Sequence, residues 1–189
     1  FGNFETTALD LATFKGSPQA ESGGTWMLAD PGVPKDVAAM GIDIVGHANN
    51  HATDWGVEGM IETLKLLDAA HLVRAGTGRT MAEARAPAYY DGPQGRVALV
   101  SATTTFTPMT PAADPLGRVP GRPGANVIRS TEVGQVSEAD LAVLARITGT
   151  KPGAPVRIKG RDFRLVEAPT TPMTIGYDLN RKDLAANLL

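Results

Sequence analysis

Residues 41–56 read GIDIVGHANNHATDWG, and this stretch gives the clearest indication of the fold. The short β-branched run at 42–46 is typical of a buried strand. The pattern at 34–40 before it predicts a short helix, because Pro34 suits a first helical turn. After it, apolar residues recur at helical spacing over 57–70, which predicts an amphipathic helix. Those apolar residues are Val57, Met60, Ile61, Leu64, Leu67 and Ala70.

The elements that follow continue the alternation of strands and helices. Residues 71–76 resemble another short strand, and 80–86 a short helix or turn. Residues 88–90 and 96–103 predict two strands separated by a tight Asp-Gly connection. Strand, helix and strand in succession imply right-handed crossovers, so we expect an α/β fold with a mostly parallel sheet flanked by helices. In such sheets ligands usually bind beyond the carboxyl ends of the strands.

The C-terminal half of the chain is less regular. Residues 107–129 form a long Pro- and Gly-rich loop, a kind of segment that is uncommon in compact domains unless it is functional or flexible. Residues 137–147 predict a helix that begins with a capping serine. Residues 156–167 predict a β-hairpin extension turning at a Lys-Gly pair. Residues 180–189 predict a helix that an asparagine caps.

Composition narrows the classes of function. With 189 residues and 42% hydrophobic content, the chain can bury a core and is expected to form one domain. A formal net charge of −2 argues against nucleic acid as the main partner. No apolar run reaches the roughly 18 residues that a transmembrane helix needs. Because the sequence has no cysteine, disulfides and thiolate metal sites are excluded. The chain begins with Phe1, so we expect a processed or excerpted chain.

The turn after the predicted strand contains residues that can hold hard metals and move protons. The amide oxygen of Asn50 suits a divalent metal ion, and His51 could act as a general acid. Asp54 could fix the tautomer of that histidine or cap the following helix. Upstream, Asn3 and Glu5 are two residues apart and share one face if a strand ends there. The alternative is that both segments are ordinary turns and surface loop.

Taken together, the segments GNFETTALD (2–10) and GIDIVGHANNHATDWGVEG (41–59) resemble the CapA family of bacterial capsule and poly-gamma-glutamate synthesis proteins. The family pattern is Asn-Leu-Glu, then Ala-Asn-Asn-His-x-x-Asp-x-Gly, an amphipathic helix, and Gly-x-Gly. In this sequence the corresponding segments are Asn3-Phe4-Glu5, Ala48-Asn49-Asn50-His51 with Asp54 and Gly56, and Gly76-Thr77-Gly78. Residues 122–126 also resemble an Arg-Pro-Gly-x-Asn segment that occurs later in the family pattern. The resemblance implies a metallophosphoesterase-like fold with α/β/β/α layers.

By this resemblance, each site residue acquires an expected role. Asn50 corresponds to a metal-binding asparagine, and Asn3 and Glu5 to a block whose side chains reach the metal site. His51 corresponds to the histidine that contacts or protonates substrate, and Asp54 to a supporting catalytic aspartate. The implied cofactors are divalent metal ions, namely Mn, Fe, Zn or Mg.

The resemblance also indicates that the site is incomplete. Such sites use an acidic block on the first strand and histidines from later strands, and no such residues are found here. The other histidines are His71, expected at a strand entrance, and His47, which has no assigned role. We therefore expect residues 1–189 to be a single CapA-like domain, an excerpt that lacks the first and last motif strands. The alternative is a family member that has lost the chemistry.

Three functions are compatible with the sequence. The first is a capsule or poly-gamma-glutamate biosynthesis protein of the cell envelope, acting as a metal-dependent hydrolase on a surface polymer or phosphoester. The second is a non-catalytic accessory module that binds a polyanionic polymer or its membrane-bound synthase. In that case the carboxylates of the polymer could bind to Arg118, Arg122 and Arg129. The third is an α/β domain with a well-capped turn and no site.

Overall fold

The computed structural model describes residues 1–19, 22–166 and 173–188. Two compact units make up the chain. The first contains Phe1–Ile128 and the last residues from Ala186 on, and the second contains Arg129–Ala185. Both units combine helices with strands, which confirms a general α/β fold. The single domain over residues 1–189 stays a prediction.

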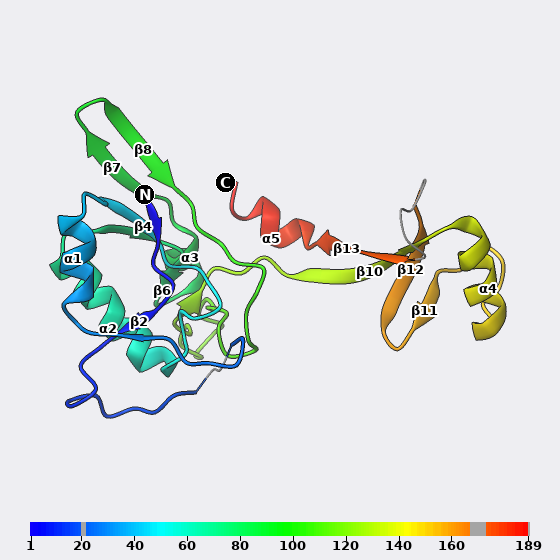
Figure 1. Ribbon diagram of the computed structural model, residues 1–189, viewed down its shortest axis with the longest axis horizontal. Coiled ribbons are helices and arrows are strands. Elements are labelled where there is room, and N and C mark those ends of the chain that lie inside the picture. Colours follow the sequence, from blue (N-terminus) through cyan, green and yellow to red (C-terminus); the bar gives the residue numbers. More distant parts are fainter. Residues whose placement is uncertain (20–21, 167–172, 189) are drawn as a thin grey trace. The chain divides into compact units, whose positions relative to one another are not determined.

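A parallel three-stranded sheet forms the centre of the first unit (Figure 1). Its strands lie in the order β1 (Gly2–Asn3), β4 (Ile44–Gly46) and β5 (Val73–Ala75). Strand β4 is buried along its whole length, as its β-branched sequence predicts. In register, Asn3 lies opposite Gly46, so the carboxyl ends of β1 and β4 meet at one edge.

Helices α1 (Val33–Ala39) and α2 (Gly56–Ala69) pack with this sheet. Both helices were predicted within two residues of their observed bounds, and the proline of α1 lies in its first turn. The apolar face of α2 enters the core because its residues recur with the helical period. The buried core residues are Phe4, Ala8, Val45, Met60, Leu64, Leu67 and Leu72.

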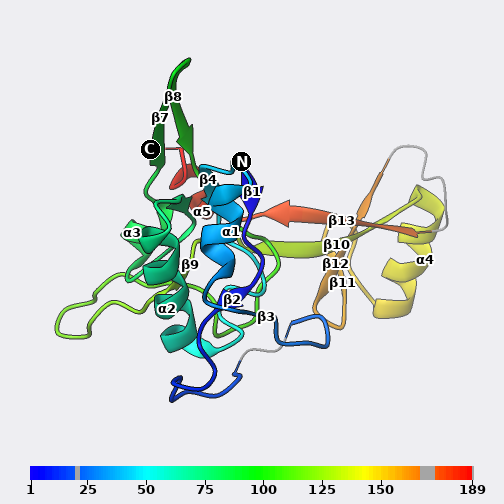
Figure 2. The ribbon, with the colours of Figure 1, turned by 60° about the vertical axis from the view of Figure 1, so that its left-hand side comes forward.

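Short elements complete the first unit. Strand β2 (Thr7–Ala8) pairs in parallel with β3 (Leu28–Ala29), and β6 (Thr77–Gly78) pairs antiparallel with β9 (Gly124–Ala125). The segment predicted to be a short helix or turn forms helix α3 (Met81–Arg85). Strands β7 (Ala88–Gly92) and β8 (Gly95–Leu99) form an antiparallel hairpin, visible at the top of Figures 1 and 2.

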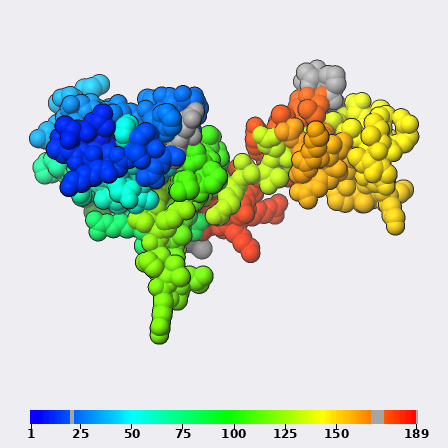
Figure 3. All heavy atoms as spheres, turned by 90° about the horizontal axis from the view of Figure 1, so that it is seen from below, coloured from blue at the N-terminus to red at the C-terminus, as the bar shows by residue number. Residues whose placement is uncertain are grey.

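The Pro- and Gly-rich segment 107–129 folds back on itself. The backbones of Ala113 and Arg122 exchange two hydrogen bonds of 2.9 Å, and those of Leu116 and Val119 exchange two of 3.0 Å. The result is a narrow green projection in Figure 3. At its base, Ala125 of β9 donates to Thr110 over 2.8 Å. Backbone pairing therefore orders this segment without any periodic pattern of apolar residues.

The second unit contains a four-stranded sheet with two helices. The strand order is β11 (Val156–Ile158), β12 (Arg161–Leu165), β10 (Ser130–Val136) and β13 (Met173–Leu179). Only the pair β10–β12 is parallel. The sheets of the protein are therefore mixed, and the prediction of a mostly parallel sheet holds for the first unit alone.

Local signals in the second unit were predicted well. The hairpin β11–β12 turns at Lys159 and Gly160, which both have positive φ angles. Helix α4 (Glu138–Thr148) begins after Ser137, whose hydroxyl accepts from the Asp140 backbone over 3.2 Å. The amide oxygen of Asn180 caps α5 (Arg181–Ala185) in the same way. Residues 167 and 189, the predicted ends of the hairpin and the last helix, lie outside the described residues.

No helix in the described part of the chain is long and apolar enough to cross a membrane.

We predict that Thr63→Val destabilises the first unit by about 1–3 kcal/mol. Thr63 lies fully buried in α2, and its hydroxyl accepts the backbone N–H of Ala8 over 2.9 Å. Valine has the same shape but leaves that N–H unpaired. The matched control is Thr148→Val in α4, where the hydroxyl is exposed and bonds within its own helix. Urea unfolding of both variants tests this. Equal effects would contradict the role given to Thr63.

Candidate functional site

The site is built where the parallel strands β1 and β4 end. The backbone N–H of Phe4 donates to Gly46 over 2.9 Å, just beyond β1, and that of His47 donates to Ala75 over 2.9 Å, just beyond β4. These bonds bring residues 3–5 alongside the motif at 47–54. The sequence predicted this location, because the carboxyl ends of parallel strands share one edge of the sheet.

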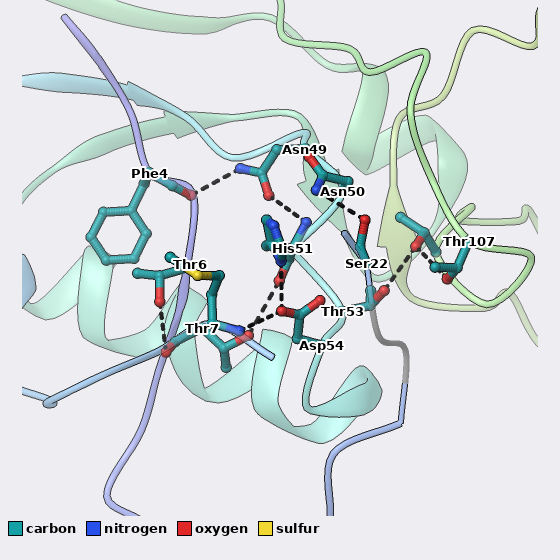
Figure 4. A network of polar contacts seen from close by, with 12 residues as sticks. Phe4, Thr6, Thr7, Ser22, Asn49, Asn50, His51, Thr53, Asp54 and Thr107 are labelled. Carbon is teal, nitrogen blue, oxygen red and sulfur yellow. Dashed lines mark hydrogen bonds and ion pairs between the residues drawn. The ribbon is translucent and has the colours of Figure 1, made fainter. Parts of the chain in front are cut away.

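A histidine–aspartate pair is the best-defined feature of the motif (Figure 4). Nδ1 of His51 lies 2.7 Å from Oδ2 of Asp54. The aspartate side chain is fully buried, whereas 10% of the surface of the histidine side chain is exposed to solvent. Burial raises the pKa of Asp54, and hydrogen bonds from the Met27 backbone and from His51 oppose that rise. The Met27 N–H donates to the same oxygen over 2.6 Å.

These contacts decide between the two roles that the sequence left open for Asp54. The N-cap of α2 is Trp55, and no side chain caps that end of the helix. The prediction that Asp54 caps the helix is therefore wrong. Its carboxyl group instead holds His51 and the backbone of Met27, while its carbonyl accepts the Gln19 N–H over 2.8 Å.

Asn49 joins the two segments of the site. Its Nδ2 donates to the carbonyl of Phe4 over 3.0 Å and to Oδ1 of Asn3 over 3.3 Å. Its Oδ1 accepts the backbone N–H of His51 over 3.1 Å. The buried amide therefore fixes the end of β1 against the histidine. Sequence reasoning missed this role, although the doubled asparagine of the motif was a signal for it.

The three predicted metal ligands lie at the same edge but are only partly brought together. Nδ2 of Asn3 donates to Oε2 of Glu5 over 2.9 Å, and both side chains are exposed. Asn50 is half-buried and donates to the hydroxyl of Ser22 over 3.0 Å. Among the described residues there is no group of three or more His, Cys, Asp or Glu side chains that could hold a metal ion. The metal-binding roles stay a prediction.

His47 lies in the core. It is fully buried, its Nδ1 lies 2.9 Å from the Thr77 hydroxyl, and its ring meets Phe4 edge-on at 6.0 Å. The pKa of His47 is lowered to about 4, mainly because burial disfavours the charged ring. The Thr6 backbone opposes this decrease, and the positive charge of Arg74 contributes to it. Its Nε2 has no hydrogen-bond partner among the residues described. A neutral, buried ring is suited to packing.

A chain of threonine hydroxyls, which sequence reasoning also missed, connects the motif to the segment 107–129. The Thr53 hydroxyl lies 2.9 Å from that of Thr110, which lies 3.1 Å from that of Thr107. Thr53 and Thr110 are fully buried. The long segment is thus fixed to the motif at its base.

Two of the three arginines proposed to bind carboxylates of a polymer have intramolecular contacts. Arg122 donates to the Met109 carbonyl over 2.5 Å, and Arg129 pairs with Asp183 at 2.8 Å. Arg118 is exposed on the projection.

Comparison with known proteins places the chain in a family. Residues 1–158 match the family described as bacterial capsule synthesis protein PGA_cap. The chain belongs to the PGA_cap family. This confirms the resemblance to capsule synthesis proteins that the Ala-Asn-Asn-His motif carries, and it connects the chain to an envelope-related role.

Two curated relatives of this PGA_cap chain come from Sinorhizobium fredii (strain NBRC 101917 / NGR234), Uncharacterized protein y4sH and Uncharacterized protein y4uA. Each is 43% identical over 190 residues, which cover 98% of this chain and 41% of the relative. The chain thus spans about two fifths of the length of the relatives it matches.

We predict that His47 makes the stability of this PGA_cap chain depend on pH. The folded-state pKa of about 4 lies below the ordinary 6.5, so the unfolded state binds more protons between these values. Stability is therefore full above pH 6.5 and falls by about 3 kcal/mol as the pH drops to 4.

The test is urea unfolding between pH 7.5 and 4.5. His47→Asn, which keeps a polar atom for Thr77, should flatten this pH dependence. His71→Asn is the matched control, because His71 is exposed and has a φ of 58°, which asparagine tolerates. An unchanged pH dependence in His47→Asn would contradict the assignment.

Proposed function

We propose that the protein is a metal-dependent hydrolase with a metallophosphoesterase-like fold that acts on a cell-surface polymer or phosphoester during capsule or poly-gamma-glutamate synthesis. The observation that carries the proposal is the pair formed by His51 and the buried Asp54 at the carboxyl ends of β1 and β4. Family membership supports the connection to the capsule and to the cell envelope. The activity, the substrate and a membrane-bound synthase as partner are parts of the proposal.

In the proposed reaction His51 acts as a general acid. Protonated imidazole keeps its Nδ1–H on Asp54 and presents Nε2–H to the leaving-group oxygen. As water attacks the scissile centre and the bond to the leaving-group oxygen breaks, the proton moves from Nε2 to that oxygen, and the ring is left neutral with its Nδ1–H still held. The carboxyl group selects the tautomer and the orientation of the ring, and Asn49 fixes the backbone of the histidine.

Oxygen atoms of Asn3, Glu5 and Asn50 are the proposed ligands for a divalent ion. Amide and carboxylate oxygens are the type of ligand that Mn²⁺ and Mg²⁺ prefer. These ions take about six ligands, so the residues described here do not complete a site by themselves. The steps assigned to this chain therefore involve only proton transfer and positioning.

The accessory-module alternative receives less support. It depends on arginines that are available to a polyanion, and both Arg122 and Arg129 make intramolecular bonds. Arg118 is the arginine that this alternative retains.

We predict that the full-length protein contains stoichiometric Mn, Fe, Zn or Mg and that Asn50→Ala weakens binding of the ion at least tenfold. The reason is the loss of one oxygen ligand. Elemental analysis and competition with a chelator measure both effects. Asn180→Ser is the control, because it keeps a capping oxygen in the second unit. A protein without metal would refute the hydrolase proposal. If Asn50→Ala binds the metal ion as tightly as wild type, Asn50 is not a ligand, although the protein still binds metal.

We further predict that His51→Ala and Asp54→Asn each lower the rate of hydrolysis of a phosphodiester with an alkoxide leaving group by about 10²–10⁴, because such a leaving group needs a proton to depart. The double variant should lose little more than either single variant, because the two residues act as a unit. Asp91→Asn is the matched control, since Asp91 is an exposed partner of Arg96 in the hairpin β7–β8. Multiplicative losses in the double variant would show that the residues act independently.

A further inference from the structure

A cleft of the first unit lies beside α2, and the side chains of the histidine–aspartate pair do not line it. Its volume is about 890 Å³. One wall is the segment after β2, which contributes residues between Leu9 and Gln19. This segment lies below α2 in Figures 1 and 2. The other wall is a stripe of α2 running from Val57 to Lys65. The volume is within the range of small-molecule sites, which is roughly 300–1,000 Å³.

The wall formed by the segment 9–19 is held at several points. Within it, the N–H groups of Thr13 and Phe14 donate to the carbonyl of Asp10 over 3.2 and 2.9 Å. The ring of Phe14 stands edge-on to Trp55, with the ring centres 6.0 Å apart. At the far end Gln19 donates its N–H to Asp54. The cleft is therefore bounded by hydrogen-bonded backbone.

The lining of the cleft combines an apolar surface with charges of both signs. Leu9, Phe14, Val57 and Ile61 provide apolar surface from both walls. Two charged groups are available on opposite walls, the ammonium of Lys15 on the segment and the carboxylate of Glu58 on the helix. Neither forms an ion pair with another described residue.

The remaining charged groups of the lining have local partners. Glu62 pairs with Lys65 at 3.0 Å. Asp10 accepts the N–H of Ala12 over 2.9 Å and bonds to the Thr13 hydroxyl over 3.1 Å. With three carboxylates and two ammonium groups, the lining carries no excess of positive charge. A uniformly anionic polymer would therefore meet repulsion here.

We propose that this cleft binds a short zwitterionic peptide. The ammonium end of the peptide pairs with Glu58, its carboxylate end pairs with Lys15, and its apolar side chains cover Phe14 and Ile61. Charge complementarity across the two walls selects this class of ligand over polyanions and over neutral chains. The site is separate from the proposed hydrolase chemistry and does not depend on it.

The test is calorimetric titration of the full-length protein with trileucine that has free termini. We expect saturable binding that weakens at least tenfold when the termini are acetylated and amidated. Glu58→Lys and Lys15→Glu should each weaken binding of the peptide at least tenfold. The variant that carries both changes should bind the peptide again, now in the opposite direction along the cleft. Both residues are exposed, so these changes leave the fold intact, which thermal melts verify.

Lys35→Glu is the matched control, an exposed charge reversal on α1 outside the cleft lining, and it should not affect binding. Trileucine that fails to bind at millimolar concentration would overturn the proposal. So would equal binding of the capped peptide, or single charge variants that bind like wild type. Tighter binding of triglutamate would identify the site as one for polyanions and would equally refute it.

Discussion

The carboxyl group of Asp54 is the constraint on which the arrangement around the motif depends. It is fully buried, and burial alone would favour its neutral form. Two donors bond to its Oδ2, the N–H of Met27 just before β3 and the ring of His51, while its Oδ1 has no hydrogen-bond partner among the described residues. The backbone of the same residue holds Gln19. Asp54 thus holds the ring of His51, the backbone of Met27 before β3, and the backbone of Gln19 at the end of the cleft wall.

The parallel pairing of β1 and β4 supplies the second half of the site. Because Asn3 is in register with Gly46, the residues that follow both strands emerge at one edge of the sheet. Asn49 then makes this proximity specific through bonds to Phe4 and His51. A one-residue change of register would turn the side chains of β1 to the opposite face and remove Asn3 from the amide that contacts it.

The sequence predicted what local chemistry determines. The strand–turn–helix unit, the capping residues Ser137 and Asn180 and the turn at Lys159 all follow from nearby residues. Strands β10 and β13 were missed, because pairing between residues far apart in sequence stabilises them. At Asp54 the sequence offered the local contact with His51 as one of two roles, whereas the donor Met27, 27 residues away, could not be found from a local rule.

The two halves of the candidate site also differ in how complete they are within this chain. The half proposed to transfer a proton needs a histidine, a carboxyl group and a backbone donor, and all three are present and in contact. The proposed ligand half offers oxygen atoms from Asn3, Glu5 and Asn50, too few for an ion of octahedral preference. An acid–base pair can be built from one turn and its neighbours, whereas a metal centre must collect ligands from several strands. The histidine–aspartate geometry is therefore the part of the proposed site that this fold determines by itself.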